Sequence, residues 1–163
     1  MNKEEASLWR ENAEIRNDDY MEHFNNRMRF FNVNRCPTFS TIDYTGIDRK
    51  RRRVNIETKV RECDINTYDT LFIEKKKYDA LKEGWKKGIK PLFINFMRDG
   101  FHVFLVDLTQ YFTGERKIES KFVNIANYGY QREDQQVLRY LIPPRDGVYY
   151  EFDKTTEKYK RLW

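Results

Sequence analysis

The sequence predicts one α/β or α+β domain over residues 1–163, with a central mixed β-sheet flanked by helices. Three observations favour this class. Apolar residues recur at helical spacing over residues 20–31 and again over 74–87. Apolar and β-branched residues alternate or cluster, as in strands, on both sides of the second helix. The chain contains no internal repeat and no low-complexity linker, and 163 residues suffice to bury one core.

The first helical pattern follows a polar stretch. Residues 1–17 have only scattered apolar positions, and we interpret them as an N-terminal extension or a weak helix. Asp18 or Asp19 suits the N-cap of a helix over about 20–31. One face of this helix is apolar and carries Tyr20, Phe24, Met28 and Phe31. The second helix is expected to end at Gly88, a residue type favoured just beyond a helix C-terminus.

The strand patterns lie between and after these helices. Residues 38–47 and 52–61 are expected to form a hairpin, followed by a loop at 62–70 and a short apolar element at 71–73. Asp99-Gly100 is a hairpin-turn signal between apolar segments. The further strands are expected at 91–97, 101–108, 115–125 and 136–142, with an edge strand at 147–152.

The charge distribution points to a nucleic-acid partner. The formal net charge is +5, from 31 basic and 26 acidic residues, which is too small an excess to indicate such binding alone. The basic residues are clustered, however, at 49–53 and 75–77. No apolar run approaches the roughly 20 residues needed to span a membrane, and the N-terminus lacks the apolar region of a signal peptide. We therefore expect no membrane partner and a cytoplasmic protein, in the host cytoplasm if it is phage-encoded.

The cysteines and histidines do not suggest a soft-metal site. Cys36 and Cys63 lie far apart and form no metal-ligand spacing, so we expect two reduced thiols. His23 and His102 are also far apart in the sequence, and we expect both to be structural.

The strongest candidate site lies on the first hairpin. Glu57 and Lys59 are two residues apart on the second strand, so both side chains project from the same face. If the turn is centred near Lys50, Asp43 lies directly across the hairpin from Glu57. Two carboxylates and an ammonium on one sheet face suit divalent-metal binding and phosphodiester hydrolysis.

Other residues in the chain offer similar patterns. Glu-x-Lys also occurs at 74–76, 115–117 and 119–121, so the motif alone identifies nothing. Asp107, Glu119 and Lys121 form a competing set, although no periodic helix closely precedes or follows them. Asp48 is a rival for the first carboxylate, but it lies near the hairpin tip, opposite Arg52, where its ordinary role is that of a turn residue.

With its flanking helices, the hairpin resembles the PD-(D/E)XK nuclease superfamily, whose core of helix, three strands, helix and strand carries Asp on one strand and Glu-x-Lys on the next. The resemblance covers residues 18–97 and is strongest in Thr41-Ile42-Asp43 and in residues 56–60. Ile42 replaces the proline of the family motif. The first family strand has no clear counterpart, unless it is merged with residues 33–41, and Glu22 is the nearest candidate by position for an acidic residue on the first helix.

The resemblance implies a restriction-endonuclease-like core at 18–97, with 98–163 as additional strands and loops. It also implies that Asp43 and Glu57 bind Mg²⁺ or Mn²⁺ together with the main-chain carbonyl of Thr58. Lys59 would orient or deprotonate the attacking metal-bound water and stabilise the developing negative charge. Nucleic-acid phosphates would be held by Arg51, Arg52, Arg53, Arg61, Lys75 and Lys77.

Two functions follow from these expectations, and the sequence leaves both open. The first is a metal-dependent nuclease that hydrolyses DNA phosphodiester bonds, of a small stand-alone phage or mobile-element type, with a homodimer as one arrangement. The second is a catalytically idle nuclease-like protein that binds DNA or serves as a structural component of a virion or other assembly. A third reading is a globular domain whose charged residues merely pair on a sheet surface.

Overall fold

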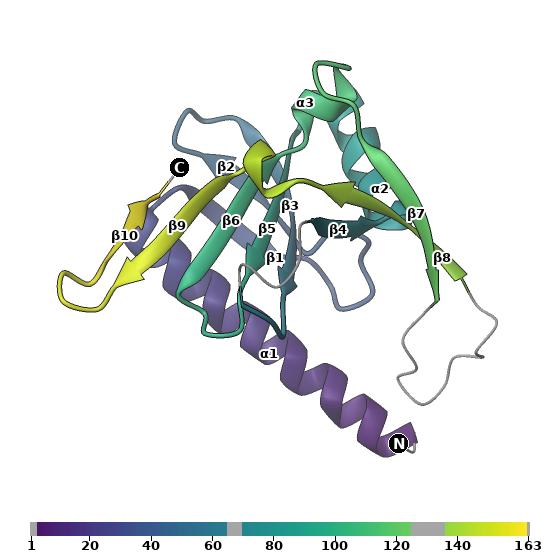
Figure 1. The fold of residues 1–163 in the computed structure, drawn as a ribbon. Helices are drawn as coiled ribbons and strands as arrows, with labels where there is room; N and C mark the ends of the chain where they lie inside the picture. Colours follow the sequence, from purple (N-terminus) through teal and green to yellow (C-terminus); the bar gives the residue numbers. More distant parts are fainter. Residues whose placement is uncertain (1–2, 65–69, 125–135, 163) are drawn as a thin grey trace.

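The fold is α+β, as expected, and is built from a large mixed sheet, a smaller sheet and helices on both sides of the large sheet (Figure 1). A computed structural model describes residues 3–64, 70–124 and 136–162. In chain order the elements are α1 (Lys3–Met28), β1 (Phe31–Arg35), β2 (Tyr44–Asp48), β3 (Arg53–Val60), β4 (Leu71–Glu74), α2 (Lys75–Lys86), β5 (Lys90–Phe96), β6 (His102–Asp107), α3 (Thr109–Phe112), β7 (Glu119–Asn124), β8 (Gln136–Ile142), a 3₁₀ turn (Pro144–Asp146), β9 (Val148–Asp153) and β10 (Lys158–Arg161).

The large sheet has seven strands in the order β1-β2-β3-β5-β6-β9-β10. All neighbouring pairs are antiparallel except β3 and β5, which run parallel and are connected through β4 and α2. Strand β5 lies at the centre of this sheet, and all its residues except Lys90 are buried, as its nearly continuous apolar sequence indicates.

The register of the β2–β3 hairpin agrees with the register expected from the sequence. Tyr44 pairs with Ile56 and Ile47 with Arg53, so the turn is centred near Lys50. The Asp48 carboxylate caps this turn, because its Oδ1 accepts hydrogen bonds from the main-chain N–H groups of Lys50 and Arg52, each at 2.9 Å. Asp48 is therefore a turn residue, and Asp43 lies just beyond the last pair, on the side of Glu57.

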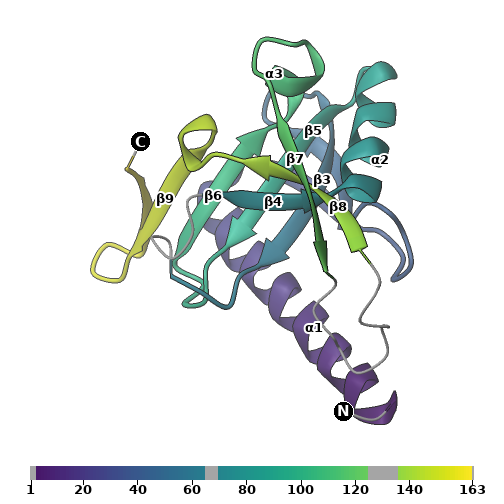
Figure 2. The ribbon, with the colours of Figure 1, turned by 45° about the vertical axis from the view of Figure 1, so that its right-hand side comes forward.

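The two faces of the large sheet are covered differently (Figure 2). Helix α1 lies across one face, where Met21 and Phe24 pack in a core with alternate residues of β3 and β5 such as Ile56 and Ile94. The opposite face is covered by α2 and by the small sheet, whose strand order is β4-β8-β7. Phe93 belongs to this second core. No helix in the described parts of the chain is long and apolar enough to cross a membrane.

The structure corrects several of the expected elements. Residues 3–28 form one continuous helix, so neither Asp18 nor Asp19 is an N-cap. Residues Phe31–Arg35 form a separate strand, β1, that was not expected from the sequence and that pairs with β2. Strand β9 is internal rather than at an edge, since β10 pairs with its outer side. Residues 65–69 of the expected 62–70 loop lie outside the described residues.

Candidate functional site

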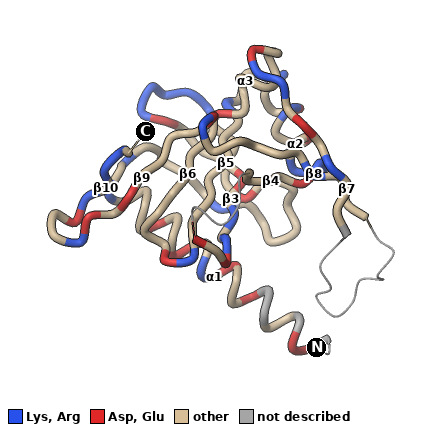
Figure 3. Tube along the Cα trace, viewed as in Figure 1, with Lys and Arg blue, Asp and Glu red and all other residues tan. Residues whose placement is uncertain are grey.

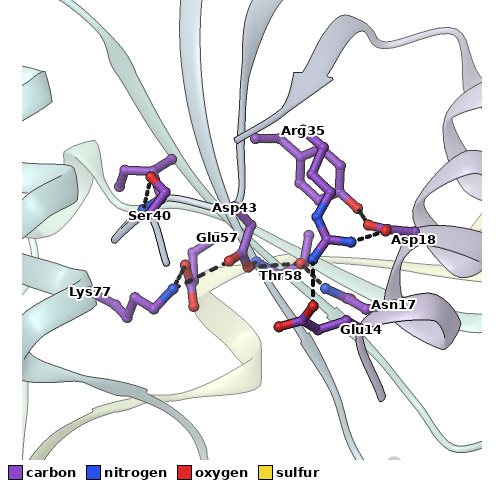
Figure 4. A network of polar contacts seen from close by, with 11 residues as sticks. Glu14, Asn17, Asp18, Arg35, Ser40, Asp43, Glu57, Thr58 and Lys77 are labelled. Atoms are coloured by element: carbon purple, nitrogen blue, oxygen red, sulfur yellow. Dashed lines mark hydrogen bonds and ion pairs between the residues drawn. The ribbon is translucent and has the colours of Figure 1, made fainter. Parts of the chain in front are cut away.

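The proposed site residues lie in a pocket of about 300 Å³ between α1, the β2–β3 hairpin, β4 and the start of α2. The polar residues of this pocket on which the argument depends are Glu14, Asp43, Glu57, Thr58, Lys59 and Lys77. Four of them were predicted from β2–β3 alone. Figure 4 shows how side chains from both helices meet those of the hairpin.

Asp43 is positioned by the end of strand pairing. Pairing between β2 and β3 stops at Tyr44 and Ile56, which leaves the main-chain N–H of Thr58 without a strand partner on that side. The Asp43 carboxylate takes the place of the missing strand. Its Oδ2 accepts hydrogen bonds from the Thr58 N–H at 2.8 Å and from the Thr58 hydroxyl at 3.0 Å. One carboxylate oxygen is thus fixed, while the other, Oδ1, faces the pocket cation Lys77.

Glu57 is the most deeply buried carboxylate of the pocket, at 7% exposed. Lys77 Nζ donates to Glu57 Oε2 at 3.0 Å and to Asp43 Oδ1 at 3.3 Å, so one ammonium joins the two carboxylates (Figure 4). Burial and the nearby Asp43 charge raise the pKa of Glu57 to about 8, although Lys77 and Lys59 oppose this shift. For Lys77, burial favours the neutral amine, but Glu57 and Asp43 outweigh it and raise the pKa of the ammonium.

Lys59 lies beside this cluster and differs from Lys77. It lines the same pocket, but among the described residues no hydrogen bond or ion pair occupies its ammonium. Burial, followed by the charge of Arg61, lowers the pKa of Lys59 below that of a free lysine. A half-buried lysine with a lowered pKa and no ion-pair partner among the described residues is suited to accept a proton or to donate hydrogen bonds to a bound ligand.

Helix α1 contributes residues that were not expected in the site. Glu14 lines the pocket and pairs with Arg35 of β1 at 3.4 Å. Asn17 donates a hydrogen bond to the Thr58 hydroxyl. Asn17 precedes the buried Phe24 by seven residues, and Glu14 precedes the buried Met21 by seven, which is helical spacing, so both lie on the face that carries Met21 and Phe24. Extending the apolar stripe of α1 towards the N-terminus would therefore have identified Glu14 as a site residue. Glu22, the acidic residue considered from the sequence, is exposed.

Part of the pocket wall is left without hydrogen-bond partners. Arg16 Nε and Asn17 Oδ1 are buried polar atoms that bond to none of the described residues. Buried polar atoms are satisfied in the great majority of cases, by protein or by bound water and ligand. These two atoms therefore leave hydrogen-bonding capacity in the pocket wall that bound water or a polar ligand can satisfy.

Arg61 takes a different place from the one expected. The residue is 7% exposed, its Nε donates to Asn95 Oδ1 at 2.8 Å and its Nη2 donates to the Phe72 carbonyl at 2.6 Å. The guanidinium also lies over the Phe72 ring, 4.1 Å from its centroid. Arg61 holds β3, β5 and β4 together, and its internal contacts take the guanidinium away from the surface where a phosphate would bind.

The basic run at the hairpin tip is exposed but distant from the pocket. Arg51, Arg52 and Arg53 are all exposed, and Arg52 pairs with Asp48 at 2.7 Å. Arg53 precedes Glu57 by four residues, or about 13 Å along the strand. Figure 3 shows this run as a blue segment at the β2–β3 turn, near the C-terminal end of the chain. The tip therefore does not border the pocket.

The other residues considered from the sequence lie apart from the pocket residues and from one another. Lys75 is exposed and pairs with Asp79 of the next helical turn. The competing set is split between the two sheets, since Asp107 lies on β6 and pairs with Lys90, whereas Glu119 and Lys121 lie on β7. His23 bonds the Tyr159 hydroxyl within the α1 core, and His102 contacts Asp99 and Glu151 near the surface. Cys36 and Cys63 are free thiols.

The arrangement offers two hard oxygen donors to a cation. Within residues 3–64, 70–124 and 136–162, no three His, Cys, Asp or Glu side chains converge as metal ligands. Asp43 and Glu57 do converge on one position, which is occupied by the Lys77 ammonium. Mg²⁺ is commonly held by one or two carboxylates, with water and substrate oxygens as its remaining ligands. The carboxylate pair therefore fits such an ion once Lys77 moves away.

No protein-family model matches this sequence, and a search of curated proteins finds no significant relative.

Proposed function

We propose that this protein is a metal-dependent nuclease that hydrolyses DNA, with its active site in the pocket of Asp43, Glu57 and Lys59. The observation that carries the proposal is the convergence of the Asp43 and Glu57 carboxylates on a single cation position beside Lys59. Carboxylate pairs that share a cation, next to a lysine with a lowered pKa, suit the hydrolysis of a phosphodiester.

The order of elements supports a restriction-endonuclease-like core and the PD-(D/E)XK resemblance. Helix α1 is followed by three antiparallel strands, then by α2, and then by β5 parallel to β3. This is the helix, three-strand, helix and strand order of the family, with the short strand β4 added in a second sheet. The added strands β6 to β10 extend the sheets and do not interrupt that order.

Each of these pocket residues would have its own role in hydrolysis. Asp43 and Glu57 would hold Mg²⁺ or Mn²⁺, with the main-chain carbonyl of Thr58 as a further ligand. A bound divalent ion would polarise the scissile phosphate and lower the pKa of a coordinated water. Lys59 would accept a proton from the attacking water or donate hydrogen bonds to a phosphate oxygen. Thr58 keeps the Asp43 carboxylate in place through two hydrogen bonds.

The proposal is tested by cleavage assays on supercoiled plasmid, branched DNA and single-stranded RNA with Mg²⁺, Mn²⁺ or a chelator. We expect metal-dependent cleavage of DNA that is lost in Glu57→Ala and in Lys59→Ala. Glu119→Ala is the matched control, because Glu119 opens an equivalent Glu-x-Lys motif on β7, outside the pocket. Activity that survives both pocket substitutions, or that is lost only in Glu119→Ala, would overturn the site.

One observation favours the second candidate function, a nuclease-like protein without turnover. The Lys77 ammonium already lies between the two carboxylates, and a permanent ion pair there would leave no room for a metal. Such a protein would act through DNA binding or as a structural component of an assembly. It would bind DNA equally well with a chelator and with Mg²⁺, and it would cleave none of the three substrates.

A further inference from the structure

Lys77 contacts the same carboxylate oxygens that a metal ion would need. Its Nζ lies 3.3 Å from Asp43 Oδ1 and 3.0 Å from Glu57 Oε2 (Figure 4). The other Asp43 oxygen is held by the Thr58 N–H and hydroxyl. A divalent cation binding to Asp43 and Glu57 would therefore compete directly with Lys77 for Oδ1 and Oε2, and both cations cannot lie between the carboxylates together.

Lys77 can leave this position without unfolding α2. It belongs to the first turn of the helix, and its side chain is 24% exposed, so the head group borders the open pocket. A lysine side chain has four rotatable bonds, which allow its ammonium to reach a new partner while the backbone stays in place. Asp43 is anchored to β3 and Glu57 belongs to that strand, so the lysine is the mobile member of the three.

The local charges indicate what would draw Lys77 away. The first turn of α2 contains Lys75, Lys76 and Lys77 and no acidic residue; the N-cap residue Glu74 is acidic, but its side chain makes no capping hydrogen bond. Positive charges are unfavourable at this end of a helix, where the peptide dipole is itself positive, and an anion relieves both effects. A phosphate entering the pocket would thus be attracted to the start of α2 and would give the Lys77 ammonium an alternative partner.

We propose that Lys77 is a resident counter-ion that keeps divalent metal off Asp43 and Glu57 until a nucleic-acid phosphate draws its ammonium away. Metal binding and nucleic-acid binding are then coupled, each strengthening the other. This inference rests on the proposed function, and it distinguishes an active nuclease with an exchangeable Lys77 from an idle protein with a permanent ion pair.

The test measures Mn²⁺ affinity by isothermal titration calorimetry, with and without a phosphorothioate DNA duplex that resists hydrolysis. The proteins are wild type, Lys77→Met, which keeps the chain length but removes the charge, and Lys76→Met. Lys76 is the matched control, because it is the exposed neighbour in the same helical turn. Without DNA, we expect Mn²⁺ to bind Lys77→Met about tenfold or more tightly than wild type or Lys76→Met.

With the duplex present, we expect the Mn²⁺ affinity of wild type to rise by most of this difference. The Mn²⁺ affinity of Lys77→Met should rise little. The comparison of wild type with and without DNA needs no substitution, so it remains decisive if Lys77→Met fails to fold. Equal Mn²⁺ affinity of wild type with and without DNA, together with metal-dependent cleavage, would overturn the counter-ion role and leave the nuclease proposal standing. Absence of Mn²⁺ binding in every protein, with and without DNA, would overturn both.

Discussion

Asp43 accepts two hydrogen bonds from Thr58, one from its main-chain N–H at 2.8 Å and one from its hydroxyl at 3.0 Å. The same hydroxyl accepts a hydrogen bond from Asn17 of α1. A short polar chain therefore runs from the long helix through β3 to the carboxylate that faces the pocket. It explains how a residue just outside a strand is held against β3.

Thr58→Val tests this chain with little change in side-chain shape. We expect the free energy of unfolding to fall by about 1 kcal/mol, because the hydrogen bonds made by the hydroxyl are removed. We also expect weaker cleavage, since Asp43 keeps only the main-chain bond. Urea denaturation and a plasmid-nicking assay measure the two effects. Thr45→Val, at an exposed position of β2, is the control, and an equal response of the two variants would contradict the role of Thr58.

The burial of Glu57 predicts a pH dependence of stability in the metal-free protein. The pKa of Glu57 rises from 4.5 to about 8 on folding, so between these values the folded state keeps a proton that the unfolded state has released. Stability therefore falls as the pH rises through this window, by on the order of 1 kcal/mol per pH unit. Urea denaturation in a chelator should show the slope in wild type and a much smaller one in Glu57→Gln. Parallel curves for the two proteins would show that Glu57 is ionised throughout.

Arg61 is predicted to support the fold rather than to bind nucleic acid. Arg61→Met keeps the length of the side chain but leaves Asn95 Oδ1 and the Phe72 carbonyl without their donor. We expect the free energy of unfolding to fall by about 2 kcal/mol, measured by urea denaturation. The salt dependence of DNA binding should stay as in wild type. A lower salt slope with unchanged stability would restore the phosphate-binding role expected from the sequence.

The hairpin tip is predicted to strengthen DNA binding without taking part in cleavage. In Arg51→Gln combined with Arg53→Gln, the slope of log affinity against log salt should decrease by about 0.9 for each phosphate that the variant no longer neutralises. Fluorescence anisotropy with a DNA duplex at several salt concentrations measures it. Lys121→Gln, which removes an exposed charge from β7, should leave the slope unchanged. If the tip variant behaves like this control, the basic run is only a solvated turn.

The sequence was sufficient for the register of the hairpin because that information is local, although the first arm, expected over 38–47, begins only at Tyr44. A basic turn near Lys50 and the alternation of residues 54–60 determine which residues pair, and the structure has that register. Gly88 likewise follows the C-cap of α2, with a φ of 83°. The length of the helix at 3–28 was underestimated from the sequence. Its first half is polar and extends away from the large sheet, where no apolar stripe is needed (Figure 1).

The contacts of the site that were not expected, including the ion pairs of the predicted phosphate-binding residue Lys77, join elements distant in the sequence. Lys77 reaches Asp43 and Glu57 only because α2 begins directly after β4, which the small sheet holds over β3. Glu14 reaches the pocket only because α1 continues through the stretch interpreted as an extension. The burial of Arg61 depends on Asn95 and Phe72, and an arginine at the end of a strand ordinarily indicates surface.

The most direct test of the central claim is the position of Mn²⁺ in crystals grown with a DNA duplex, located by its anomalous scattering. We predict a peak in contact with the carboxylates of both Asp43 and Glu57, with the Lys77 ammonium turned toward a phosphate. A DNA-bound crystal with Lys77 still between the two carboxylates, and with no Mn²⁺ there, would contradict the account.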